Sequence, residues 1–198
     1  ASLDITEETL RGGITVENPN YNYTGNSVRA SFESRKTDQS KTSGFESTKT
    51  GFSLGTSFEH RHNVFLAPEI QTSYEDVSVD SSASSAVKKM AGTYTNFDFL
   101  YGITLDKRNQ TFQPTDGYRI KFIQKIPLYA DSPDILNGLN LSRYHALSDN
   151  VIAAVKFYGR TIHSLSSSDD VRLTSRLYLP SNNLRGFQTK RVGPKDSE

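Results

Sequence analysis

The sequence contains no cysteine and no tryptophan, and only one methionine, among its 198 residues. Without cysteine the chain has no disulfide framework, no thiolate nucleophile and no cysteine-based metal site. Its 23 Lys and Arg residues nearly balance 22 Asp and Glu residues, so the formal net charge is only +1. The sequence therefore lacks a strong field of one sign that would attract nucleic acid or an anionic surface.

Long apolar runs are missing as well. A transmembrane helix needs about 20 predominantly apolar residues, whereas the longest apolar runs here are a few residues, such as 151–155. The opening residues, ASLDITEETL, have no basic region followed by an apolar one, so no signal peptide is visible. The sequence therefore predicts no membrane-spanning helix.

The chain is rich in aromatic residues, with 10 Tyr and 11 Phe, and apolar and polar residues alternate. In 97–105, for example, every second residue is Phe, Tyr, Ile or Leu. Such a period of two predicts half-buried strands, and no window keeps a capped helical pattern. We predict eight strands, near 9–17, 26–34, 50–59, 63–76, 94–105, 117–127, 138–147 and 151–164. A weaker alternation follows at 171–179.

The predicted connections alternate between short turns and longer segments rich in Ser, Lys and Asp. An antiparallel meander would place the two kinds at opposite ends, which is typical of outer-membrane barrels. A soluble β-sandwich is the alternative, because its strands alternate too. Two features favour the barrel. The strands are long compared with the usual ~5–6 residues, and charges lie mid-strand, as a watery lumen requires (Arg29, Lys121, Lys125, Lys156 and Arg160).

A strand–turn–strand stretch in 101–122 contains Asp106, Arg108, Phe112, Pro114, Thr115, Asp116 and Gly117. A second stretch, in 184–196, contains Leu184, Arg185, Gly186, Phe187, Gly193 and Pro194. A third, in 16–32, contains an Asn-Pro-aromatic turn. These stretches resemble, respectively, the strand–turn–strand signature, the sixth extracellular loop and a periplasmic turn of the BamA-like outer-membrane β-barrel assembly proteins, also called the surface antigen D15 family. The stretches appear in family order, so the resemblance covers nearly the whole chain.

The resemblance implies an all-β fold and a domain organisation. Family members carry POTRA domains followed by a sixteen-stranded barrel. Residues 1–198 would be a partial barrel domain with no POTRA domain, in which 9–17 is the fourth strand and 151–164 the eleventh. Because flanking strands would be missing, the expected fold is an open, curved antiparallel sheet. Residues 165–198 would form an extracellular loop that folds into the lumen, which predicts loop rather than strand at 171–179. The chain departs from the family at 180–183, where PSNN replaces the usual Gly pair.

The implied function is non-enzymatic: folding and inserting β-barrel proteins into the outer membrane of a Gram-negative bacterium. The implied partners are outer-membrane lipid, unfolded outer-membrane proteins and the lipoproteins of the assembly complex. No cofactor, small-molecule substrate or nucleic acid is expected. Within the loop motif, the resemblance implies that Arg185 anchors the loop to the barrel wall. A small passive barrel or porin-like channel is the alternative, since eight strands can close a small barrel.

Catalytic and metal sites have only weak support in the sequence. His60 and His62 lie in a predicted tight turn without an acidic partner motif. His163 lies near Ser164, Ser166 and Asp169, but triads are recognised by geometry, and G-x-S-x-G is absent. In the turn motif, Pro114, Asp116 and Gly117 have a structural explanation: a preset φ, side-chain turn bonds and a positive φ, respectively. We therefore predict no catalytic, metal or cofactor residues.

Overall fold

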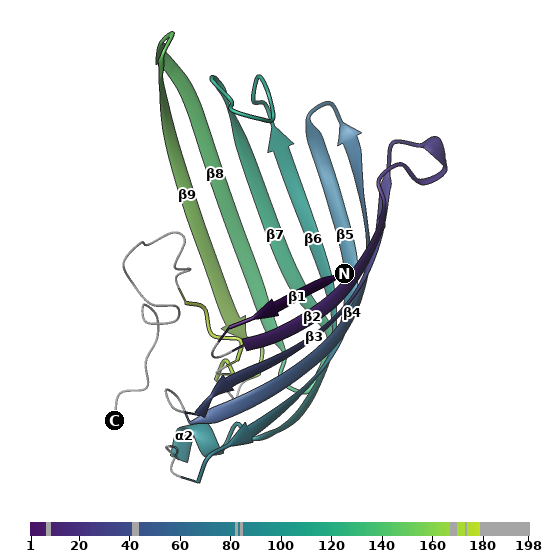
Figure 1. The fold of residues 1–198 in the computed structure, drawn as a ribbon, viewed down its shortest axis with the longest axis vertical. Helices are drawn as coiled ribbons and strands as arrows, with labels where there is room; N and C mark the ends of the chain where they lie inside the picture. Colours follow the sequence, from purple (N-terminus) through teal and green to yellow (C-terminus); the bar gives the residue numbers. More distant parts are fainter. Residues whose placement is uncertain are drawn as a thin grey trace.

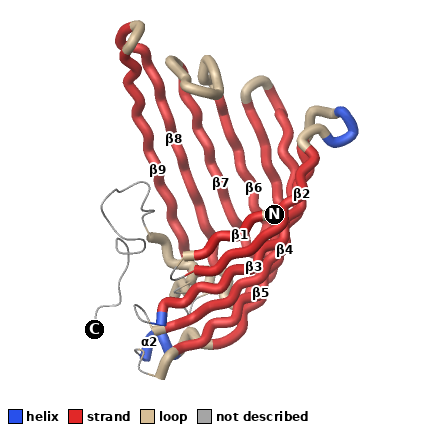
Figure 2. The backbone as a smooth tube through the Cα atoms, in the orientation of Figure 1, coloured by secondary structure: helices blue, strands red, loops and turns tan. Residues whose placement is uncertain are grey.

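The computed structural model describes residues 1–6, 9–40, 44–81, 83, 85–166, 170–172 and 174–178. Within these residues, nine strands form one antiparallel sheet in sequence order (Figures 1 and 2). The strands are β1 (Ser2–Ile5), β2 (Thr9–Asn18), β3 (Ser27–Gln39), β4 (Phe45–Arg61), β5 (Val64–Val79), β6 (Gly92–Asp106), β7 (Gly117–Ala130), β8 (Asp134–Ser148) and β9 (Val151–Ser164). A 3-10 turn, η1 (Tyr21–Tyr23), and a single helical turn, α2 (Ser85–Lys88), lie between strands.

The sheet is strongly curved and open (Figure 1). In the described part of the chain, β1 pairs with β2 and β9 pairs with β8, so β1 and β9 are the two edges. This confirms the predicted open antiparallel meander. The sandwich alternative is wrong, because the strands belong to one sheet rather than to two packed sheets.

The two faces of the sheet differ in the way that the period of two predicted. The buried side chains of the strands are mostly polar and include Ser47, Ser53, Ser73, Glu75, Asn96 and Asp98. Intervening residues point to the other face and remain exposed, among them Phe52, Leu54, Ile70 and Phe97. Two of the described residues that follow β9, Arg172 and Thr174, contact the buried Glu75 on the inside of the curved sheet. The polar face is therefore the concave one, and the apolar face is convex.

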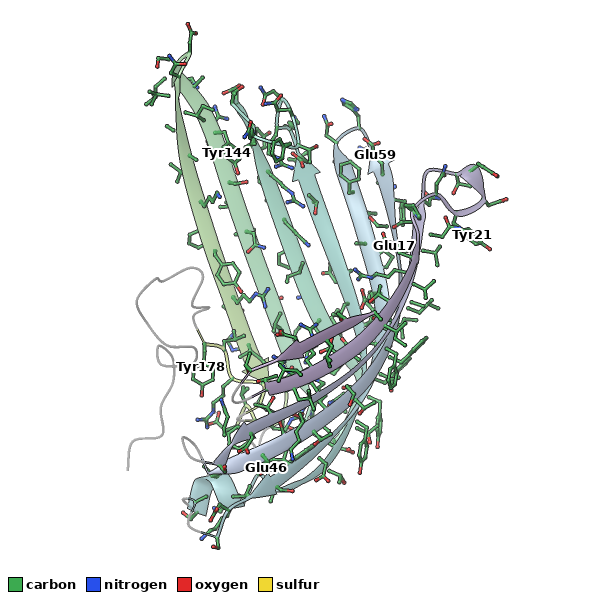
Figure 3. The ribbon with its side chains drawn as sticks, in the orientation of Figure 1. Glu17, Tyr21, Glu46, Glu59, Tyr144 and Tyr178 are labelled. Carbon is green, nitrogen blue, oxygen red and sulfur yellow. The ribbon has the colours of Figure 1, made fainter. Side chains whose placement is uncertain are left out.

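The sheet has two distinct ends. We call the end with connections 19–26, 62–63, 107–116 and 149–150 the turn end, and the opposite end, which carries α2 and connection 131–133, the α2 end. In Figure 3, Tyr21, Glu59 and Tyr144 mark the turn end and Glu46 the α2 end. The described residues have only a small apolar core, at the α2 end, where Val87 packs with Phe45 and Val77. No helix in the described ranges is long and apolar enough to cross a membrane.

Strand boundaries differ from the prediction mainly at the α2 end. The eight predicted strands correspond to β2–β9, but β3 and β4 extend to within a few residues of each other. Polar ladders extend this hairpin, including Thr37 opposite Ser47 and an ion pair of 3.2 Å between Lys36 and Glu46. The connection expected to be long near 128–138 is a turn at 131–133. The predicted alternation of short and long loops is therefore wrong there.

The weak alternation at 171–179 does not correspond to a strand. Its described residues, 171–172 and 174–178, belong to no strand. The backbone N–H groups of Ser175 and Arg176 both donate to the carbonyl oxygen of Arg172, at 2.9 and 3.0 Å. These bonds close a turn and leave 176–178 outside any ladder. The alternation there was therefore misleading as a sign of a strand.

Candidate functional site

A buried ion pair joins the segment after β9 to the concave face. The Nη1 of Arg172 donates to Oε2 of Glu75 on β5 over 3.1 Å. Both side chains are nearly inaccessible, with 7% and 4% of their surfaces exposed. Burying two charges is tolerated only when they are paired and hydrogen-bonded. This contact therefore fixes where the segment crosses the sheet.

Three further groups surround this pair. Asn96 on β6 accepts a 3.5 Å hydrogen bond from Nη2 of Arg172. The guanidinium also lies over the Tyr94 ring, 4.5 Å from its centroid, and Thr174 Oγ1 donates to Glu75 Oε2 over 3.3 Å. Cation–π and charge-assisted contacts of this kind are strongest when desolvated. Among the residues that the structure describes, none accepts a hydrogen bond from the Nε of Arg172. We call Arg172, Glu75, Asn96, Tyr94 and Thr174 the inner anchor.

Other charges extend the inner anchor along the concave face. Lys125 on β7 forms an ion pair with the buried Asp134 at the start of β8. Lys49 and Asp98 lie close enough to interact electrostatically with these groups and with Arg172. Together the set has three cations (Lys49, Lys125 and Arg172) and three carboxylates (Glu75, Asp98 and Asp134). Because the cations and carboxylates are equal in number, their formal charges cancel, and each buried charge has opposite charges nearby.

The predicted turn motif lies in the connection between β6 and β7, at the turn end. Arg108 donates to both carboxylate oxygens of Asp106, from Nε over 2.8 Å and from Nη2 over 2.6 Å. Its Nη1 also donates to the carbonyl oxygen of Thr111 over 3.2 Å. Side-chain hydrogen bonds from Arg108 hold the pKa of Asp106 below its usual value. Asp106 ends β6, beyond the outward apolar positions of 97–105.

Asn109 organises the rest of this connection. Its Oδ1 accepts from the backbone N–H groups of Thr115 and Asp116, at 3.2 and 3.3 Å, and its Nδ2 donates to Thr115 Oγ1 over 2.6 Å. We predicted such side-chain turn bonds for Asp116. The structure assigns them to Asn109 instead, and Asp116 Oδ1 lies 3.4 Å from Nδ1 of His145 on β8.

Gly117 has the positive φ, 101°, that the turn motif predicted. A Cβ atom here would lie 2.2 Å from the carbonyl oxygen of Lys107, so only glycine fits. Phe112 in the same connection is 80% exposed and contributes no core packing. Asp106, Arg108, Thr115 and Gly117 are thus brought together, whereas the Phe112 side chain points away into solvent.

The loop motif of 184–187, 193 and 194 lies outside the described residues, so the anchoring role of Arg185 stays a prediction. Asp169 also lies outside the described residues. The group of His163, Ser164, Ser166 and Asp169 considered in the sequence is therefore described only in part. His62 is almost fully exposed, and its Nδ1 lies 3.9 Å from Glu59 Oε1. Within the described ranges, no group of three or more His, Asp or Glu side chains is placed to hold a metal ion.

Sequence reasoning missed the inner anchor. The local sequence contains one indication of it. Glu75 alternates with outward residues in the middle of a strand and shares the inward face with Ser73 and Val77, which places a carboxylate inside the sheet. Its partner Arg172 is 97 positions away, and no local pattern links the two. Asn109 could have been found, because Asn side chains commonly bond the backbone of their own turn.

A curved antiparallel sheet that buries polar residues inside and exposes apolar residues outside is characteristic of the wall of a β-barrel. Comparison with known families agrees with this class. The Omp85 superfamily domain matches residues 1–198, so the chain belongs to the Omp85 superfamily. A search of curated proteins found no match.

Among solved structures, the fold is similar to BamA from Haemophilus ducreyi lacking POTRA domains 1-3. The TM-score is 0.80 at 17% sequence identity, and the match covers 94% of this chain. The chain spans 39% of that BamA chain. The nine strands therefore have the fold of part of a BamA-like barrel.

Proposed function

We propose that the chain is part of an outer-membrane assembly factor that folds and inserts β-barrel proteins. This function is non-enzymatic: no covalent bond is made or broken. The observation that carries the proposal is the match of the Omp85 superfamily domain over residues 1–198. The chain covers 39% of the similar BamA chain, so the activity, the substrates and the partners of the whole protein all belong to this proposal.

The two-faced sheet supports a place in the outer membrane. On β6 the outward apolar side chains run from Phe97 to Leu105. Nine residues rising about 3.3 Å each cover roughly 30 Å, close to the apolar band of about 25 Å in outer-membrane barrels. The convex face would contact lipid, and the concave face, with the inner anchor, would line a polar lumen.

Residues 165–198 are proposed to be an extracellular loop that folds into this lumen. The inner anchor supports the first part of this path, because it holds Arg172 and Thr174 against β5. On this orientation, the turn end faces the periplasm. Unfolded outer-membrane proteins and assembly-complex lipoproteins are the proposed partners. Strand edges with unpaired N–H and C=O groups provide the chemistry by which such proteins can template an incoming strand.

A depletion experiment separates this function from a passive channel. The protein is depleted in its own cells, and the amounts of several unrelated outer-membrane barrel proteins are measured. We expect them to fall together while inner-membrane proteins stay constant. The proposal fails if barrel proteins persist and only permeability to small solutes changes. The open sheet argues against a small closed barrel, since β2 pairs with β1 and β3 rather than with β9.

A further inference from the structure

A shallow groove crosses the convex face near the turn end, over β7, β8 and β9. It encloses about 320 Å³. Its outward side chains form two rows across the three strands: Tyr118, Arg143 and Val155 in one row, and Ile120, Leu141 and Phe157 in the other. The groove therefore crosses three strands with one cation among five apolar or aromatic side chains.

The apolar lining of the groove is uncovered in the described structure. Val155 is 71% exposed and Phe157 is 54% exposed. An exposed apolar surface that is contiguous across several strands marks a binding surface for lipid or protein. Leu141 and Phe157 lie directly opposite each other in the β8–β9 ladder, so together they form a floor on which a hydrocarbon chain can lie.

Arg143 provides the polar end of the groove. Its guanidinium lies 5.9 Å from the centroid of the Tyr118 ring. Among the described residues, no ion pair joins it to a carboxylate. Asp116, which directly precedes β7, lies beside His145 instead. An arginine without an acidic partner offers its forked donors to an anion, and phosphate matches their geometry.

The position of this cation along the wall indicates the source of the anion. Gly117, where β7 begins, pairs with Tyr144, and Tyr118 pairs with Arg143. The two side chains thus lie where the wall meets the turn end. Tyrosine is enriched at this level in membrane proteins, because its ring is apolar and its hydroxyl is polar. Lipid head groups lie at the same level.

We propose that this groove binds an anionic phospholipid from the leaflet at the turn end. Its phosphate is held by Arg143, and an acyl chain lies over Leu141 and Phe157. A lipid without a head-group ammonium is preferred, because the ammonium would be repelled by the unpaired guanidinium. The inference rests on the proposed membrane location, but it adds a defined lipid site to it.

The test measures lipid retention on the purified protein in detergent. Native mass spectrometry follows phosphatidylglycerol or phosphatidylcholine added at equal concentration. We expect Arg143→Gln to lower phosphatidylglycerol retention about fivefold, as loss of one cation near an anionic surface implies, and to leave phosphatidylcholine unchanged. Val155→Trp, which fills the groove, should lower retention of both lipids.

Lys156→Gln is the matched control. This substitution also removes one positive charge. Lys156 follows Val155 on β9, but its side chain points to the concave face, away from the groove. The proposal is overturned if Arg143→Gln retains as much phosphatidylglycerol as the unmodified protein, or if Lys156→Gln loses as much. A protein that stays in solution without detergent and retains neither lipid would instead overturn the membrane location.

Discussion

The Nη1 atom of Arg172 and Oε2 of Glu75 lie 3.1 Å apart, although 97 positions separate the two residues. Each partner is buried, so removing one of them would leave the other charge uncompensated and would destabilise the fold. The path of the segment after β9 therefore depends on one residue of β5, Glu75. Removal of either partner tests how strongly that path is held.

Glu75→Gln should lower the free energy of unfolding by about 3–5 kcal/mol, because it leaves Arg172 buried without its counter-charge. Denaturant unfolding in detergent measures this loss. Limited proteolysis should also cut 165–178 faster in the variant. Arg172→Met alone should have a comparable cost, since it removes the ion-pair partner of the buried Glu75 carboxylate.

The double variant Glu75→Gln/Arg172→Met distinguishes a specific pair from two independent defects. Its loss should be smaller than the sum of the two single losses by about 0.5–3 kcal/mol, the usual coupling between contacting residues. Strict additivity would contradict the assigned contact.

Gly117→Ala should destabilise the protein by about 2–4 kcal/mol, because it adds a methyl group in a left-handed conformation and in a closed space. The added Cβ would lie 2.2 Å from the carbonyl oxygen of Lys107. Gly25→Ala is the control: its φ is also positive, at 77°, but no atom lies within 4 Å of the added Cβ. Its loss should be about 1–2 kcal/mol. Equal losses would show that backbone conformation alone decides.

Gly117 also illustrates what the sequence could reveal. Turn chemistry is local, so the Pro-Thr-Asp-Gly run predicted the positive φ correctly. The period of two likewise predicted β2 to β9, because each strand has one polar and one apolar face. The four residues of β1 were missed, since they are too few to show a period. The Glu75–Arg172 contact depends on how the whole sheet curves, and that information is not local.

Stability should depend on pH through Asp106. Hydrogen bonds from Arg108 lower the pKa of Asp106 in the folded protein, while the unfolded pKa is about 3.9. The carboxylate therefore contributes stability that is fully present above the unfolded pKa. This contribution is lost as the pH falls through the lower folded pKa. Denaturant unfolding measured from pH 6 down to pH 3 would follow the loss.

Asp106→Asn provides the comparison for this pH dependence. The variant should be less stable than the unmodified protein at pH 6, and the difference should shrink toward pH 3. A difference that stays constant over this range would show that Asp106 does not contribute through its charge. Arg108→Gln should reduce the same pH dependence, since Arg108 is the main cause of the shift.

Adjacent residues on β5 provide a test of the two faces. Ile70 points to the convex face and is 46% exposed, whereas Gln71 points to the concave face, opposite Asp98. If the convex face contacts lipid, Ile70→Lys should cost about 2–4 kcal/mol in a bilayer. Gln71→Lys should cost little, because it places the new charge in a polar lumen and across from a carboxylate.

Unfolding in lipid vesicles measures both variants, and the contrast between them is the informative quantity. A convex face in water would accept Ile70→Lys with a change within about 0.5 kcal/mol, as most exposed substitutions do. Equal stability of the two variants would therefore contradict a membrane location, whatever the absolute values. A selective loss for Ile70→Lys would locate the lipid on the convex face, because the two positions share one strand and one depth.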